Sequence, residues 1–180
     1  INTVVEAVDK IRDTAESHDR LFFVEVMGRD AGYIALNSGI ACGAEDILIP
    51  EQVTNIEDVL SRIDRDERRK KNVHIIVVAE GDDFGDSRAL GDAISGRFPG
   101  LDVRICVLGH IQRGGSPSFA DRVLASRLGH SAMVALLEGN TQVMAGVMND
   151  EIVFTPFDKV IKQNAKISED MLTLIKVLSA

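Results

Sequence analysis

The amino-acid sequence predicts an α/β protein built on an open parallel sheet with helices on its faces. Apolar runs typical of buried parallel strands recur at Leu21–Met27, Asp46–Pro50, Val73–Ala79 and Val103–Leu108. Segments with helical spacing separate these runs, and strands that alternate with helices form parallel sheets. We therefore expect a three-layer, doubly wound fold, whose strand order the sequence leaves open.

The helices of this fold are predicted from apolar spacing and capping residues. Residues 1–16 form the first helix, with Val4, Val8 and Ile11 on one face. Because the first residue is not methionine and this pattern starts in mid-helix, we expect a piece of a longer polypeptide. Three further helices are expected from Tyr33 to a C-terminal cap at Gly43, after a cap at Asn55, and over Ser87–Phe98.

Beyond residue 115 the pattern changes to a long helix, a hairpin and a final helix. These elements are expected at Phe119–Glu138, Gln142–Met148, Glu151–Phe154 and Ser168–Val177. Pro117 suits the first turn of the long helix. We therefore expect a first domain over residues 1–110, a second segment over residues 111–160, and a C-terminal helix within residues 161–180.

Composition excludes several classes of protein. A hydrophobic content of 45% in 180 residues allows a real core, and a net charge of −8 argues against general nucleic-acid binding. No apolar run approaches the roughly 20 residues of a membrane helix, and we expect no signal peptide. Cys42 and Cys106 stand in apolar contexts and are expected to be buried thiols. These features predict a cytoplasmic protein without membrane or nucleic-acid partners.

Polar residues follow three predicted strands at the points where they end. Arg29, Glu80 and His110 occupy these places, and Arg113, in the run LGHIQRGGSP, offers a planar fork of donors suited to phosphate. Each residue has a simpler interpretation: Arg29 paired with Asp30 or Glu25, Glu80 as a solvated or capping acid, His110 as a loop histidine. Because such coincidences would have to occur three times, we favour one shared ligand pocket, with Arg104 grouped beside His110 and Arg113.

Two other charged stretches favour ordinary surface roles. Arg68–Lys71 is a basic run that is either a solvated helix face or a second phosphate site. Asp82 and Asp83 are expected to be hydrated rather than to bind a metal. The sequence contains neither GxxxxGK[ST] nor GxGxxG, so it carries no recognisable nucleotide cradle.

Three stretches resemble the short bacterial type of ATP-dependent 6-phosphofructokinase: VEVMGRDAG, IPE at Ile49–Glu51, and LGHIQRGGSPSFADRVLASRLG. The resemblance extends over almost the whole chain and implies the sugar-phosphate domain of that family. It also implies transfer of the γ-phosphoryl group of ATP to the 1-hydroxyl of fructose 6-phosphate, with Mg2+, in a homotetramer of glycolysis.

The resemblance assigns residues to a substrate site and to an allosteric site. Arg29 is implied as the catalytic residue, which neutralises the phosphoryl group in transfer. The implied substrate-binding residues are Arg20, Met27, Gly28, Arg29, Glu80, Arg104, His110, Ile111, Gln112 and Arg113, of which Arg20 and Arg104 serve the neighbouring subunit's site. The implied site for ADP or a similar effector comprises Arg12, Gly43, Ala44, Glu45, Arg69, Lys71, Asn72 and Val73. Gly43 and Glu45 would lie beside its magnesium ion, and Asn72 replaces the basic residue common there.

The glycine-rich ATP loop, the magnesium aspartate and the TIDND-type stretch of the family are missing from this sequence. We therefore expect a carboxy-terminal fragment with essentially no catalysis of its own, because phosphoryl transfer depends on positioning and on the metal. The second segment would lack its usual packing partner and expose apolar surface. Two alternatives stay open: a pyrophosphate-dependent phosphofructokinase, and a non-enzymatic phosphosugar- or nucleotide-binding regulator.

Overall fold

The computed structural model describes residues 1–15, 20–68, 73–160 and 167–178. The chain forms two compact units, one of Ile1–Gly115 with Ile167–Ala180 and one of Ser116–Lys166. These units divide a few residues beyond the limits expected at residues 110 and 160. Assignment of the second segment to an ATP-binding domain stays a prediction.

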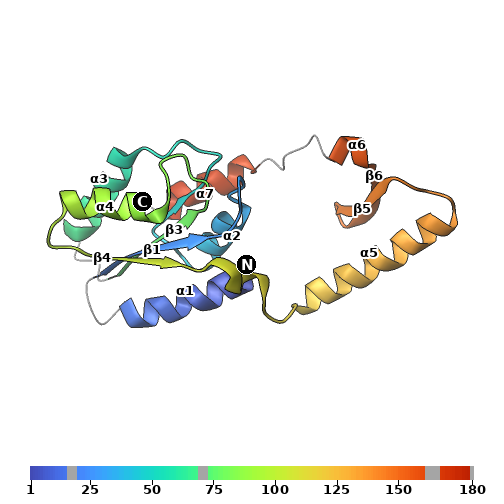
Figure 1. The fold of residues 1–180 in the computed structure, drawn as a ribbon, viewed down its shortest axis with the longest axis horizontal. Helices are drawn as coiled ribbons and strands as arrows, with labels where there is room; N and C mark the ends of the chain where they lie inside the picture. The colour runs from blue at the N-terminus through green and yellow to red at the C-terminus, as the bar shows by residue number, and fades with distance from the viewer. Residues whose placement is uncertain (16–19, 69–72, 161–166, 179–180) are drawn as a thin grey trace. The chain divides into compact units, whose positions relative to one another are not determined.

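The first unit is built on a four-stranded sheet in the order β2-β3-β1-β4 (Figure 1). The strands are β1 (Arg20–Val26), β2 (Asp46–Leu48), β3 (Val73–Ala79) and β4 (Asp102–Val107). All pairs are parallel, with Arg20 opposite both Val73 and Asp102. The expected parallel α/β fold is confirmed, and its strands all end at one edge of the sheet, which we call the carboxyl edge. The edge at which they begin is the amino edge.

Helices α1 (Asn2–Ala15), α2 (Tyr33–Ala41) and α7 (Glu169–Leu178) cover one face of this sheet. Alternate strand residues point to this face because side chains in a strand alternate between its two faces. The core on this face includes Val4, Val8, Val24, Val26, Ala35, Leu36, Ile47, Ile75, Val77 and Ile175. Cys106 packs at its margin, and both cysteines are free thiols of intermediate burial, where the sequence predicted buried ones.

Helices α3 (Ile56–Arg68) and α4 (Ser87–Arg97) cover the opposite face. Its core includes Leu21, Phe23, Val59, Ile63, Ile76, Val78, Leu90 and Ile94. Two carboxylates stabilise the start of α4. Asp86 accepts hydrogen bonds from two backbone N–H groups of the first turn. Glu25 accepts hydrogen bonds from the N–H and the hydroxyl of Ser87. The three layers predicted from the sequence are therefore present.

The second unit contains α5 (Phe119–Leu137), the hairpin of β5 (Val143–Met148) and β6 (Glu151–Pro156), and α6 (Phe157–Val160). Ser118 caps α5 in a reciprocal capping box with Asp121. Pro117 therefore precedes the cap, and its predicted place in the first helical turn is wrong. Arg127 of α5 binds both the carboxylate and the carbonyl of Asp150 in the hairpin turn, at 2.7 and 2.6 Å.

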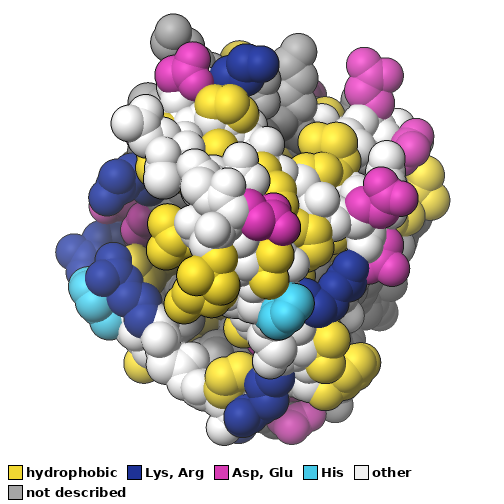
Figure 2. Space-filling view, turned by 90° about the vertical axis from the view of Figure 1, so that its right-hand side faces the viewer, with side chains coloured by type: hydrophobic (Ala, Val, Ile, Leu, Met, Phe, Trp, Pro, Cys, Tyr) yellow, Lys and Arg dark blue, Asp and Glu magenta, His cyan; other side chains and the backbone are white. Residues whose placement is uncertain are grey.

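Large apolar side chains are exposed on this second unit. They include Phe119, Val123, Leu124, Met133, Leu136, Leu137, Met144, Met148, Phe154 and Phe157. Figure 2 shows hydrophobic side chains, in yellow, between polar ones on the face that it draws. Single exposed apolar residues are ordinary, but so many in 51 residues indicate a surface made for contact.

Leu90→Ala tests the α4 face of the core. Leu90 is 0% exposed, so we expect the change to lower the free energy of unfolding by about 2–5 kcal/mol through lost burial and a residual cavity. Urea unfolding followed by circular dichroism measures this loss. Arg88→Ala, at an exposed position of the same helix, is the matched control and is expected to change it by less than about 0.5 kcal/mol. Equal losses in both variants would contradict this description of the core.

Candidate functional site

The ends of three strands meet at the carboxyl edge of the sheet. Met27, Gly28 and Arg29 follow β1, Glu80 follows β3, and the short 3-10 helix η1 (Gly109–Arg113) follows β4. Parallel register brings them together, because Glu25 and Val26 of β1 lie opposite Val78 and Ala79 of β3. The residues that follow β1, β3 and β4 therefore lie at one edge of the sheet, as the sequence predicted.

Glu80 binds the backbone that follows β1. Its Oε1 atom accepts hydrogen bonds from the N–H groups of Gly28 and Arg29, at 3.1 and 2.6 Å. These two hydrogen bonds, with the positive charges of Arg113 and Arg29, hold the pKa of Glu80 below its ordinary value. Glu80 is thus an ionised acceptor at neutral pH that already holds this segment, rather than a merely solvated acid.

Gln112 holds the same segment from the other side. Its Oε1 atom accepts a hydrogen bond from the N–H of Met27 at 3.0 Å, which orients the side-chain amide. The Nε2 atom of Gln112 is buried and has no hydrogen-bond partner among the described residues. Two side chains from two different strand ends therefore fix three successive backbone N–H groups, those of residues 27, 28 and 29.

The backbone of this segment is tightly turned. Arg29 has a φ of 55°, a conformation that non-glycine residues rarely adopt. A Cβ atom on Gly28 would lie 2.2 Å from the carbonyl oxygen of Ala31, and one on Gly81 would lie 2.5 Å from that of Arg29. Only glycine fits at either position, so the hydrogen bonds that the backbone N–H groups donate to Glu80 and Gln112 maintain a strained turn.

Long polar side chains of the carboxyl edge are exposed to solvent. Arg29, His110 and Arg113 are exposed, as is Ile111. Among the described residues, Arg29 forms no ion pair with either Asp30 or Glu25, and Glu25 is bound to Ser87 instead. The simpler interpretation of Arg29 as a paired strand-end arginine is therefore wrong, and its guanidinium is available to a ligand.

Asp82 and Asp83 differ from the expected hydrated loop. Asp82 is 5% exposed and accepts hydrogen bonds from the Thr54 hydroxyl at 2.8 Å and the Phe84 N–H at 3.1 Å, while Asp83 accepts from the Thr54 N–H. Burial raises the pKa of Asp82. These acids join two loops, and among the described residues no group of three or more His, Cys, Asp or Glu side chains is placed to hold a metal ion.

Arg20 and Arg104 lie at the amino edge of the sheet, not with the other predicted substrate residues. β1 has seven residues, so its two ends are about 20 Å apart, and Arg20 begins the strand that Met27 follows. Both arginines bind Asp102, which the sequence did not single out, and these bonds lower the pKa of that carboxyl. The grouping of Arg104 with His110 and Arg113 is therefore wrong within one chain.

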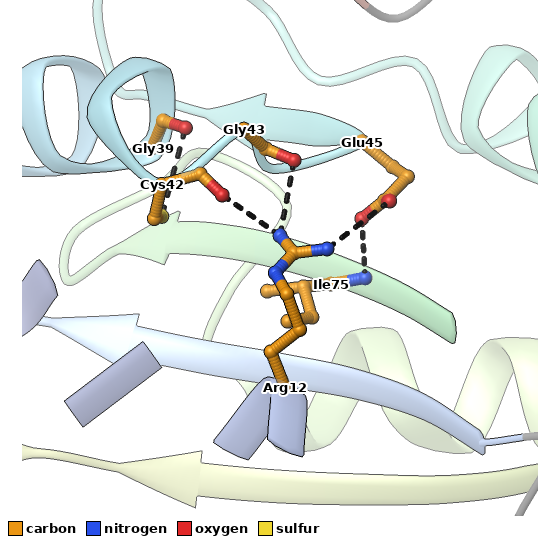
Figure 3. Close-up of polar contacts among 6 residues, drawn as sticks. All are labelled: Arg12, Gly39, Cys42, Gly43, Glu45 and Ile75. Carbon is orange, nitrogen blue, oxygen red and sulfur yellow. Dashed lines mark hydrogen bonds and ion pairs between the residues drawn. The ribbon is translucent and has the colours of Figure 1, made fainter. Parts of the chain in front are cut away.

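The predicted effector residues that the structure describes form a cluster around Arg12 (Figure 3). The Arg12 guanidinium donates to the carbonyl oxygens of Cys42 and Gly43, at 2.8 and 3.1 Å, and lies 3.9 Å from the Glu45 carboxylate. Glu45 also accepts a hydrogen bond from the N–H of Ile75 at 2.7 Å. Gly43 follows α2 with a φ of +62°, which turns the chain and places its carbonyl toward Arg12.

This cluster does not present a metal site in the described arrangement. The Gly43 carbonyl and the Glu45 carboxylate both face the Arg12 guanidinium, whose charge opposes a cation between them. Arg69, Lys71 and Asn72 lie outside the described residues, as does the side chain of Val73, while the Ala44 N–H donates to the Gly39 carbonyl. An effector magnesium beside Gly43 and Glu45 stays a prediction that these contacts do not support.

The sheet, its flanking helices and the polar carboxyl edge define an open α/β protein of the kind that binds small anionic ligands where parallel strands end. The sequence profile of the family described as phosphofructokinase matches residues 1–136. The chain belongs to the phosphofructokinase family, as its motifs predicted.

Named relatives agree with this assignment. The chain is 49% identical over 179 residues to an ATP-dependent 6-phosphofructokinase 2 of Bacteroides thetaiotaomicron, and 50% identical over 179 residues to an ATP-dependent 6-phosphofructokinase of Shouchella clausii. Each match covers 99% of this chain and 55% of the relative. The chain thus spans about half the length of the curated relatives it matches.

Solved structures show the same fold. A phosphofructokinase from Saccharomyces cerevisiae is similar with a TM-score of 0.82 and 34% identity, over 98% of this chain and 25% of that one. A pyrophosphate-dependent phosphofructokinase from Marinobacter aquaeolei is similar with a TM-score of 0.78 and 25% identity, over 99% of this chain and 53% of that one. No helix among the described residues is both long enough and apolar enough to span a membrane.

Glu80→Gln tests whether the ionised carboxylate holds the turn at Gly28 and Arg29. We expect the change to lower the free energy of unfolding by about 1 kcal/mol at pH 7, because an amide oxygen accepts weaker hydrogen bonds and solvent screens the site. Folding lowers the pKa of Glu80, so its contribution is complete above its ordinary value of 4.5 and declines below it, where the unfolded chain is protonated first.

Urea unfolding of both proteins over a pH series measures this difference. Glu6→Gln, at an exposed position of α1, is the control for removing one surface charge. A difference between wild type and Glu80→Gln that does not shrink in acid would contradict the role assigned to the carboxylate.

Proposed function

We propose that this chain supplies the fructose 6-phosphate half of a phosphofructokinase active site. Two features support the proposal: membership of the family, and the meeting of Arg29, Glu80, Gln112 and Arg113 at the carboxyl edge. The second feature carries it, because two exposed guanidinium groups beside a backbone turn held by side chains make a preformed anionic-ligand site.

Within this site the residues take different roles. Arg113 and His110 bind the 6-phosphate, with Ile111 and Gln112 completing the loop around it. Met27 and Gly28 border the sugar, and Glu80 accepts from its hydroxyl groups through Oε2, while Oε1 is bound to the turn. Arg29 binds the phosphoryl group in transfer and is the catalytic residue, because stabilisation of developing charge is the main demand of this reaction.

The same reaction requires a second copy of the chain. Arg20 begins β1, about 20 Å from the carboxyl edge of its own sheet, and the Arg104 side chain is bound beside it through Asp102. Both arginines therefore reach a 6-phosphate only in a neighbouring subunit. A homo-oligomer, tetrameric in the complete protein, provides that arrangement. The phosphoryl donor is ATP with Mg2+, on polypeptide outside this chain, as the names of the similar bacterial relatives favour. The protein acts in glycolysis in the cytoplasm.

Regulation belongs to the cluster around Arg12. Its guanidinium is held by carbonyl oxygens that anionic phosphates of ADP outcompete as ligands, so Arg12 is the described residue most suited to bind an effector. Gly43, Ala44 and Glu45 border the same place, and Arg69, Lys71, Asn72 and Val73 follow in the sequence. The exposed apolar side chains of the second unit, in turn, pack against the ATP-binding domain.

Arg113→Ala and Arg29→Ala separate binding from chemistry. Both are made in a chimera that joins this chain to the amino-terminal part of the Bacteroides thetaiotaomicron relative. Arg113→Ala is expected to raise KM for fructose 6-phosphate about tenfold with little change in kcat, since it removes a ground-state phosphate contact. Arg29→Ala is expected to lower kcat about a hundredfold, because charge develops there in the transition state.

Steady-state kinetics with fructose 6-phosphate and ATP, and with pyrophosphate as the other donor, measures these effects. Arg88→Ala, at an exposed position of α4, is the control. Small and equal effects of both substitutions would refute the roles, and binding of fructose 6-phosphate without turnover by either donor would favour the non-enzymatic alternative.

Arg12→Ala tests the effector site in the same chimera. We expect affinity for ADP to fall by about tenfold or more, because a charged hydrogen-bond donor to phosphate is lost. KM for fructose 6-phosphate without ADP is expected to stay unchanged. Calorimetric titration with ADP measures the affinity, and Arg12→Lys separates charge from the planar fork. Undiminished ADP binding by Arg12→Ala would remove Arg12 from the site.

A further inference from the structure

A carboxylate stands between the two arginines of the amino edge. Arg20 and Asp102 lie directly opposite each other in the pairing of β1 with β4. Arg104 follows Asp102 by two residues on β4, so the alternation of side chains puts all three on the same face of the sheet. This face is the one that α1 covers, as the packing of Phe22 and Cys106 there indicates.

The hydrogen bonds of Asp102 engage one side of each guanidinium group. Arg20 donates from Nε to Oδ2 at 3.0 Å. Arg104 lies with Nε 2.8 Å from Oδ1 and donates from Nη2 to Oδ2 at 3.0 Å. Nη1 of Arg104 and both Nη atoms of Arg20 have no contact of this kind with any described residue. The carboxylate therefore binds one side of each guanidinium group. Nη1 of Arg104 and both Nη atoms of Arg20 are left to donate to a third partner.

We propose that Asp102 is a positioning residue of the phosphosugar site, which orients Arg20 and Arg104 as one unit toward the 6-phosphate bound by a neighbouring copy. The inference rests on the proposed function, which assigns these two arginines to that phosphate. Asp102 itself does not touch the substrate. It acts through the two guanidinium groups.

The physical need for such a residue follows from exposure and charge. The side chain of Arg104 is 55% exposed and that of Arg20 is 24% exposed, so packing alone fixes neither. Ordering long side chains costs entropy, and two neighbouring cations repel each other. Asp102 offsets both costs before the ligand arrives and leaves the cluster with one net positive charge for the phosphate.

Removing the charge of Asp102 can either weaken or strengthen the binding of fructose 6-phosphate, and the direction of the change tests the proposal. If Asp102 only competes with phosphate for the arginines, removing its charge strengthens binding of fructose 6-phosphate. If Asp102 positions the arginines, removing its charge weakens binding although the site becomes more positive. Because the 6-phosphate takes no part in the chemistry, the change falls on KM rather than on kcat.

The experiment is steady-state kinetics of Asp102→Asn and Asp102→Glu in the chimera with the amino-terminal part of the Bacteroides thetaiotaomicron relative. We expect Asp102→Asn to raise KM for fructose 6-phosphate roughly three- to tenfold with kcat within about twofold of wild type. Asp102→Glu, which keeps the carboxylate, is expected to recover most of the affinity. Asp92→Asn, at an exposed position of α4, is the control for the loss of one negative charge and is expected to leave KM unchanged.

A second measurement separates positioning from a general loss of structure. In a variant that already lacks both arginines, adding Asp102→Asn is expected to have no further effect on KM, because Asp102 acts only through them. Asp102→Ser replaces Asp102→Asn if circular dichroism shows that the latter does not fold.

The outcomes separate the positioning role of Asp102 from the proposed function of the chain. An unchanged or lowered KM in Asp102→Asn, or an equal rise in KM in the variant without arginines, overturns the positioning role and leaves the proposed function intact. A wild-type chimera that neither binds nor phosphorylates fructose 6-phosphate overturns the proposed function, and the role of Asp102 with it.

Discussion

The parallel pairing of β1 with both β3 and β4 is the constraint on which the site depends. Each strand end brings different groups to the carboxyl edge: a turn whose backbone N–H groups donate hydrogen bonds after β1, a carboxylate after β3, and an amide with a guanidinium after β4. A shift of register by two residues would separate Glu80 from the N–H groups of Gly28 and Arg29 by about 7 Å. The fully buried residues Phe23, Val77 and Leu90 exclude such a shift, so the core fixes the chemistry at the edge.

Much of this arrangement could be predicted because it depends on local patterns. Unbroken apolar runs mark strands buried on both faces, and the polar residues that follow them must lie at the carboxyl edge of a parallel sheet. What the sequence could not show is which donor meets which acceptor. Whether Glu80 faces solvent or the backbone of residues 28 and 29 depends on the strained φ of Arg29, which no periodicity encodes. Asp102 was missed for the same reason: its signal is the strand pairing that sets it opposite Arg20, and strand order is not readable from sequence.

Most of the wrong assignments arise because contacts between residues distant in sequence decide where a side chain lies. Arg104 stands only six residues before His110, but its side chain is bound to Asp102 at the start of β4, whereas His110 lies beyond the end of that strand. Pro117 lies close to the start of α5, yet Ser118 forms the cap with Asp121, so Pro117 stays outside the first turn. The carboxylates of Asp82 and Asp83 accept hydrogen bonds from Thr54, which lies 28 positions before Asp82 in the sequence.

The separation of the two arginine groups carries a consequence for the assembled protein. Arg29 and Arg113 stand at one edge of the sheet, and Arg20, with the Arg104 side chain bound beside it through Asp102, stands at the other. A single sugar phosphate is too small to bridge the roughly 20 Å over which β1 separates these edges. If both groups serve one ligand, the site is shared between two copies, and ligand affinity then depends on how the copies are placed. Asp102 binds both Arg20 and Arg104. A rotation of one copy relative to the other would therefore move both arginines together and change both of their contacts with the phosphate. The affinity for the sugar phosphate would then respond to that rotation in a single step instead of through two independent contacts.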